Sequence, residues 1–266
     1  MTVLRARDIK AKARAALRVD RQFLRYVAGY LLLNLIVILL VLPLSLILSA
    51  GIEMSGIMPF FQPGGHPEIG LFLDTDVMLP LLGSTLVFSL LVMYPIGFSV
   101  WGQSAMSIAA VRRGLTFGHS LSGWGHGWRM GWILAVKWLY VSLWWLLLVV
   151  PGIVKFISYS MTEFIAVDHP DWSANRCIAE SRRLMHGNKM RYFLFNLSFI
   201  GWGILLNVVW HMQQLLLGMF CQCMIVPYYE TARAVFYEDL LDRDERKRVT
   251  EDAPDAAEAK DGGGET

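Results

Sequence analysis

Long apolar stretches alternate with short charged segments along the chain, and their lengths predict membrane-spanning helices. A helix of about 20 apolar residues is long enough to cross a hydrocarbon layer of ~30 Å. Four stretches meet this requirement directly, at 26–50, 79–101, 192–210 and 215–236.

The apolar segment 131–167 is harder to interpret because it is too long for one crossing. As a single straight helix it would measure ~55 Å. Pro151 and Gly152 fall just past its middle and favour a break there. We therefore predict a helical hairpin with spans at 131–149 and 153–167, which makes six spans in all. A re-entrant pair of helices is the alternative.

Two further segments have the spacing of amphipathic surface helices. The basic segment 1–25 places Ile9, Ala13 and Leu17 on one stripe, so we expect it to lie on the inner membrane surface. Residues 173–186 form the second predicted helix, on the cytoplasmic side. Ser173 is a suitable N-cap, and a glycine at position 187 suits the C-terminal turn.

The distribution of positive charge predicts the orientation. Eight bases lie within 1–25, and no lysine or arginine occurs between Arg25 and Arg112. Because cytoplasmic segments carry the excess of positive charge, the first 25 residues belong inside and the acidic connector between the first two spans belongs outside. With an even number of crossings, both termini are expected in the cytoplasm. The acidic segment 241–266, rich in alanine and glycine, is predicted to be disordered.

Composition agrees with an all-α, polytopic membrane helix bundle. Hydrophobic residues make up 55% of the 266-residue chain and charged residues only 17%, whereas soluble domains have about 25% charged residues. The first 25 residues carry a net charge of +6, which attracts anionic lipid headgroups. The lipid bilayer is thus an expected partner. Nucleic acid is not, since the chain lacks a soluble basic domain.

Ionisable side chains inside predicted spans are costly and so are candidates for function. Lys137, Glu163, Glu230 and Arg233 have this property, and interfacial anchoring with ion pairing explains them most simply. The sharper hypothesis is a polar site near the inner ends of spans four and six, where a Glu163 without a cationic partner would bind a proton or a cation. The candidate site comprises Tyr159, Glu163, Tyr228, Glu230 and Arg233.

Motifs for catalysis or metal binding are missing from the sequence. No histidine pair has the spacing of a zinc-binding helix, and there is no Gly-x-Ser-x-Gly nucleophile turn. Cys221 and Cys223 are two apart, so on a helix they point to different faces and are poorly placed to share a metal. We expect no enzymatic activity, no metal and no cofactor.

The last third of the chain resembles a known family. The matching pieces include the turn Asp168–Pro170, the triplet Ala179–Ser181, the pair Pro227–Tyr228 and the triplet Phe236–Glu238. Together they resemble the bacterial integral-membrane family catalogued as domain of unknown function 975. The resemblance implies a multi-pass protein of the bacterial cell membrane. It implies no chemistry, since that family has no established activity.

Two functions of different kinds are consistent with these features. The first is a non-enzymatic role in membrane assembly, through interaction with lipid, with another membrane protein or with a second copy of the chain. The second is a small transporter or permease-like protein, whose path would pass the polar groups of spans four and six. A polar cavity would favour the second function, and a bundle filled by apolar side chains would favour the first.

Overall fold

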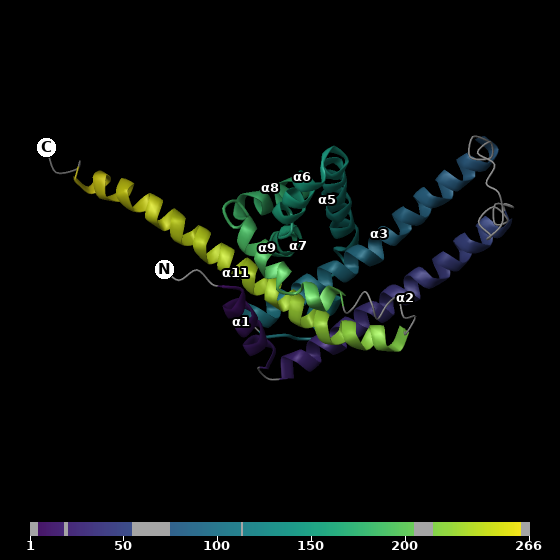
Figure 1. Ribbon diagram of the computed structural model, residues 1–266, viewed down its shortest axis with the longest axis horizontal. Helices are drawn as coiled ribbons and strands as arrows, with labels where there is room; N and C mark the ends of the chain where they lie inside the picture. Colours follow the sequence, from purple (N-terminus) through teal and green to yellow (C-terminus); the bar gives the residue numbers. More distant parts are fainter. Residues whose placement is uncertain (1–4, 19–20, 55–74, 113, 205–214, 262–266) are drawn as a thin grey trace.

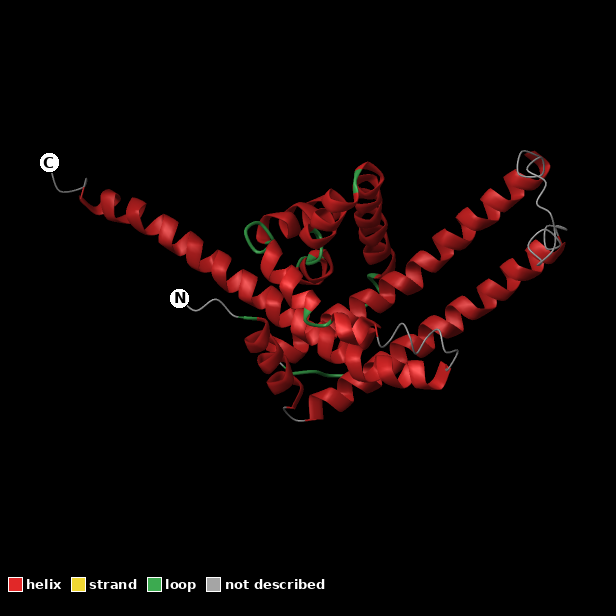
Figure 2. Cartoon of the chain, viewed as in Figure 1, coloured by secondary structure: helices red, strands yellow, loops and turns green. Residues whose placement is uncertain are grey.

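The computed structural model describes all residues except 1–4, 19–20, 55–74, 113, 205–214 and 262–266. Helices joined by short turns make up these described parts, and none of them contains a strand (Figure 2). The all-α prediction is therefore confirmed. The helices are α1 (Ala6–Arg18), α2 (Gln22–Met54), α3 (Thr75–Arg112), α4 (Gly118–Leu121), α5 (Gly127–Leu147), α6 (Val149–Ser158), α7 (Thr162–Asp168), α8 (Ala174–Leu184), α9 (Lys189–Leu197) and α11 (Leu215–Asp261).

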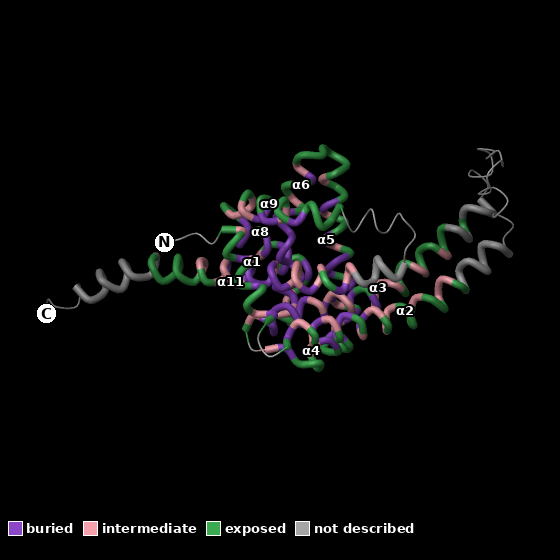
Figure 3. Tube along the Cα trace, turned by 60° about the horizontal axis from the view of Figure 1, so that its bottom comes forward, coloured by how far each residue is buried: buried purple, intermediate pink, exposed green. Residues whose placement is uncertain are grey.

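A packed body carries a projecting two-helix arm, and the C-terminal half of α11 extends away from the body on the other side (Figure 1). Helices α2 and α3 run side by side out of the body and form the arm. Near the body, α3 also packs against α5, and α11 passes across α1, α2 and α3. Buried residues gather in the body, whereas the described part of the arm is mostly exposed or intermediate (Figure 3).

Four segments of the described chain are long and apolar enough to cross a membrane: Gln22–Leu46, Leu82–Arg112, Gly127–Leu147 and Val149–Asp168. They correspond to the first four predicted spans. The prediction of six spans is not confirmed within the described residues. Within the predicted span 192–210, α9 ends at Leu197 and residues 205–214 lie outside the described structure. The predicted span 215–236 is the first half of the much longer α11.

The predicted break at Pro151 is displaced by three residues. Helix α5 ends at Leu147, and the extended backbone of Leu148 (φ −165°, ψ 147°) separates it from α6. Pro151 then falls in the first turn of α6, where backbone N–H groups have no partner within the helix. Proline is thus accommodated without the loss of a helical hydrogen bond.

The hairpin of α5 and α6 extends only a short way beyond α8. Tyr140 of α5 donates a hydrogen bond to Asn175 at the start of α8 (3.3 Å), and only seven residues of α5, or ~10 Å, follow it. On the returning side, α6 packs against α9. The tip is apolar throughout: residues 146–150 are between 57% and 87% exposed.

Helix α1 agrees with the predicted amphipathic segment but packs differently from the expectation. Its apolar stripe of Ile9, Ala13 and Leu17 is buried within the protein, and α1 lies against α11. Lys10 also donates to the carbonyl oxygen of Ser198 (2.8 Å), just beyond the C-terminal end of α9. The apolar stripe is therefore covered by protein, and the location of the basic segment on the inner membrane surface stays a prediction. Packing against α11 removes these apolar side chains from water, as contact with lipid would have done.

Helix α8 agrees closely with the predicted surface helix 173–186. The Ser173 side chain accepts a hydrogen bond from the Arg176 backbone N–H (3.4 Å), as an N-cap does. Gly187 follows with φ +77°, a conformation that glycine adopts at little cost. The apolar face, which includes Cys177 and Ile178, is buried.

The acidic segment 241–266 differs from its prediction. Helix α11 continues to Asp261, so the segment is helical over most of its length, and residues 262–266 lie outside the described chain. Ion pairs one turn apart support the helix, from Arg243 to Asp239 (2.9 Å) and from Arg248 to Asp244 (3.1 Å). Composition alone predicts disorder here because it does not show that oppositely charged residues lie four positions apart, where they can pair along a helix.

Glycines allow α3 and α5 to approach closely. A Cβ atom at Gly97 would collide with backbone atoms of Gly127 and Gly131 on α5. Small residues at a helix crossing allow such backbone proximity in membrane proteins. Gly83, on the same helix, has no atom within 4 Å of its Cβ position.

We predict that Gly97→Ala destabilises the protein by about 1–3 kcal/mol, because overpacking forces the two backbones apart. The matched variant Gly83→Ala should be neutral or slightly stabilising, since alanine favours helix by about 1 kcal/mol over glycine. Thermal unfolding in detergent measures both variants. Equal stability of the two would contradict the close crossing.

Candidate functional site

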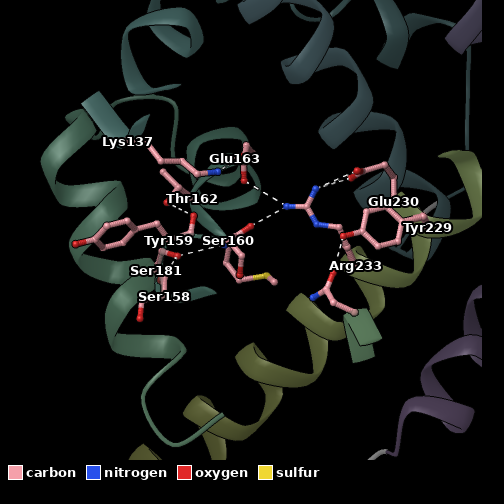
Figure 4. A network of polar contacts seen from close by, with 12 residues as sticks. Lys137, Ser158, Tyr159, Ser160, Thr162, Glu163, Ser181, Tyr229, Glu230 and Arg233 are labelled. Carbon is pink, nitrogen blue, oxygen red and sulfur yellow. Dashed lines mark hydrogen bonds and ion pairs between the residues drawn. The ribbon is translucent and has the colours of Figure 1, made fainter. Parts of the chain in front are cut away.

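Four buried charged side chains meet where α5, α7 and α11 pack together (Figure 4). Lys137 of α5 pairs with Glu163 of α7. Arg233 of α11 contacts Glu163 at 3.5 Å and Glu230 at 3.0 Å. The side chains of all four residues are at most 15% exposed. We call this group the charge cluster.

Local structure positions each member of the charge cluster. Glu163 lies in the first turn of α7, where the helix dipole favours a negative charge. Glu230 and Arg233 are three residues apart on α11, so they share one helix face. Arg233 also donates to the carbonyl oxygen of Ser160 (2.8 Å), in the turn that precedes α7. Its guanidinium lies 5.1 Å from the centre of the Phe164 ring.

The charge cluster is electrically balanced, with two cations and two anions. A buried charge is tolerated only when it is paired and hydrogen-bonded, and each charged member has a partner of opposite sign. Glu163 has two cationic partners, so the hypothesis that it lacks one is wrong. These ion pairs hold the helices together, and the carboxylate of Glu163 is already bound by Lys137 and Arg233.

Three of the five predicted site residues come together, and two do not. Glu163, Glu230 and Arg233 belong to the charge cluster. Tyr159 points away from the cluster (Figure 4) and packs with Val141 and Ile178.

Tyr228 also lies outside the charge cluster. Its ring contacts that of Phe199, with 5.5 Å between the centroids, and it lines a groove beside α1. The neighbouring Tyr229 lies nearer the cluster, with its ring 5.9 Å from the Arg233 guanidinium. The Tyr229 hydroxyl donates a hydrogen bond to the side chain of Asn196 in α9 (2.7 Å).

Lys137 is the member of the charge cluster that the predicted site lacked. It is the only charged residue between Arg129 and Lys155, and a lone base in an apolar segment signals a buried partner. The sequence did mark it as an intramembrane ionisable group. Its pairing with a residue 26 positions away depends on how α5 and α7 pack.

A second ionic group ties the end of α3 to α7 and α11. Arg112 donates two hydrogen bonds to Asp168, each 2.8 Å long, in the bidentate geometry that suits guanidinium and carboxylate. Arg112 also pairs with Glu238 (2.6 Å), and Tyr237 donates to Asp168 (2.9 Å).

A third ionic group joins α8 to α11. Arg183 contacts Glu180 and Asp244, at 2.6 Å each. Hydrogen bonds from its guanidinium hold the pKa of both carboxyl groups below their usual values. Arg191 of α9 pairs with Asp239 in the same way (2.7 Å). Helix α11 is therefore joined to α3, α7, α8 and α9 through charged or polar contacts.

The described residues offer no group of three or more histidine, cysteine, aspartate or glutamate side chains that could hold a metal ion. The two carboxylates of the charge cluster are already bound by Lys137 and Arg233. Chemically, this arrangement suits helix pairing better than proton transfer or metal binding.

We predict that Glu163→Gln or Lys137→Met alone destabilises the protein by about 3–5 kcal/mol, because the first leaves Lys137 without its partner and the second leaves one cation between two carboxylates. The double variant should be closer to wild type than either single variant, since Glu230 still neutralises Arg233. Unfolding in detergent measures all three, with the exposed Lys12→Met as the charge-matched control. Additive losses in the double variant would show that Lys137 and Glu163 do not interact.

Comparison with known proteins identifies a family for most of the chain. No curated protein and no solved structure matches the chain. Residues 85–244, more than half of the chain, match the family described as "Protein of unknown function (DUF975)". The match includes α5 to α9 and all four members of the charge cluster. The chain therefore belongs to the DUF975 family.

Proposed function

We propose that this protein is an integral membrane protein that acts without catalysis, through interaction with lipid or with another membrane component. The observation that carries the proposal is the arm formed by α2 and α3. Only 17% of the residues in the most apolar stretch of each helix are buried within the protein, and the rest are half-buried or exposed. Their apolar surface must be covered by lipid tails or by apolar helices.

The arm presents large apolar side chains along much of its described length. Leu39 and Leu46 on α2 are 63% and 60% exposed, and Leu86 on α3 is 63% exposed. A shallow groove of about 640 Å³ follows α3 where it meets α5, and its lining includes Leu86, Met93 and Trp138. An acyl chain or a partner helix has the shape and polarity to fill it.

The packed body supports an interaction role over transport. Aromatic side chains fill its interior, including Phe164, Phe195 and Phe236, each fully buried. The intramembrane charges near them are paired with one another. A transport path through the candidate site would have to break these pairs.

We further propose that both termini lie on the cytoplasmic side of a bacterial cell membrane, in accord with the distribution of positive charge. In this topology the hairpin of α5 and α6 enters the lipid and returns without crossing it. Two observations support re-entry: the ~10 Å extension beyond Tyr140 and the wholly apolar tip. An apolar tip in water would expose five large side chains at a cost, whereas in lipid it costs nothing.

Cysteine labelling in intact cells tests this topology. In a background without Cys177, Cys221 and Cys223, we expect Val150→Cys at the tip to resist a membrane-impermeant maleimide from either side. Asp171→Cys should react only from the cytoplasmic side, and a cysteine at position 68 only from outside. Reaction of Val150→Cys from outside would show that the hairpin crosses twice.

Photo-crosslinking tests the interaction role. A photoreactive amino acid at Leu39 or Leu86 should give protein adducts of defined mass in native membranes, because these side chains face outward. The same group at Trp124, exposed on the body, serves as the control. Two results together would favour transport instead: no protein adduct at the arm, and a proton or cation flux in vesicles that Glu163→Gln abolishes.

A further inference from the structure

A basic groove lies at the elbow between α1 and α2. Its volume is about 400 Å³, and its rim carries three arginines, Arg14, Arg18 and Arg21. Leu17 and Leu24 supply apolar lining, and Tyr228 of α11 also lines the groove. We call this feature the elbow groove.

The described structure gives the three arginines of the elbow groove few partners. All three are exposed, and within the described parts of the chain no carboxylate forms a salt bridge with any of them. The guanidinium of Arg14 donates from its Nε only to the carbonyl oxygen of Lys10 (3.3 Å). Guanidinium groups bind phosphate oxygens through paired, charge-assisted hydrogen bonds.

The backbone has an unusual conformation at Arg21, just before α2 begins. Arg21 has φ +56°, the only non-glycine residue of the described chain with a positive φ. The side chain of Gln22, with its amide nitrogen turned inward, donates to the carbonyl oxygens of Ala16 and Ala110, each at 3.2 Å. Strain of this kind persists where surrounding contacts hold it, and it clusters at ligand sites.

The apolar lining identifies the kind of molecule that carries the phosphate. Leu17 is buried, but Leu24 is 60% exposed and lies in the first turn of the candidate span Gln22–Leu46. The arginines therefore lie where this span would enter the bilayer, at the depth of lipid headgroups. A soluble phosphate would gain nothing from the apolar wall, whereas a phospholipid would place its chains beside Leu24.

We propose that the elbow groove binds the phosphate headgroup of an anionic phospholipid of the inner leaflet. This inference rests on the proposed membrane insertion and adds to it a defined site. The arginines would hold the phosphate, and the acyl chains would follow the exposed surface of α2. A bound lipid would thus contact α1, α2 and α11 at once.

Native mass spectrometry of the full-length protein tests the site. The protein is released from detergent containing equal amounts of phosphatidylglycerol and phosphatidylcholine, and the retained lipid is identified. We expect wild type to retain phosphatidylglycerol in preference. Replacement of Arg14, Arg18 and Arg21 together by glutamine should weaken that binding by roughly tenfold or more, since charge-assisted contacts are lost.

The matched control replaces Arg5, Arg7 and Lys12 by glutamine, which removes the same charge from the same segment away from the groove. We expect this variant to bind phosphatidylglycerol within about twofold of wild type. If both variants lost the same amount of phosphatidylglycerol binding, general surface charge would explain the binding and the proposal would be overturned. The proposal would also be overturned if the wild-type protein showed no preference for phosphatidylglycerol over phosphatidylcholine.

Competition with soluble anions separates the two sources of phosphate. Millimolar inorganic phosphate or glycerol phosphate should not displace the lipid, and displacement would show that the groove binds soluble phosphate instead. Leu24→Ser should weaken lipid retention while the groove keeps its arginines. Because every variant is compared after normal insertion and purification, loss of the site is distinguishable from failure of membrane insertion.

Discussion

The burial of Arg233 constrains the rest of the body. A guanidinium does not lose its proton in proteins, so α11 can pack into the body only if carboxylates accompany it. Glu230 comes from the same helix and Glu163 from α7, and Lys137 of α5 balances the second carboxylate. The register of three helices therefore follows from the neutralisation of one cation.

Ion pairs between α11 and its neighbouring helices also occur outside the charge cluster. Glu238, Asp239 and Asp244 each pair with an arginine of a different helix, namely Arg112 of α3, Arg191 of α9 and Arg183 of α8. Partly exposed pairs add little stability individually, but their geometry is specific. Apolar packing supplies most of the stability of the body, and the ion pairs select one arrangement of its helices.

Features that depend on local spacing were predictable from the sequence, and those that depend on tertiary contact were not. Apolar length indicated the long helices, and the Ser173 cap located α8. The stripe on α1 was recognised, but whether lipid or α11 covers it depends on packing. Part of the candidate site was found through Glu163 and its neighbours. Lys137 was omitted because its partner is 26 residues away.

The pairing within the charge cluster has a consequence for how the protein is made. Lys137 and Glu163 cancel one another within the α5–α7 segment, and Glu230 and Arg233 cancel within α11. Within each part, the members of the charge cluster are therefore already paired before the two parts meet, so none of these four side chains has to enter the lipid unpaired. The contact between Arg233 and Glu163 then joins the two ion pairs. Biogenesis can proceed in chain order, with the hairpin inserted before the ribosome has synthesised α11.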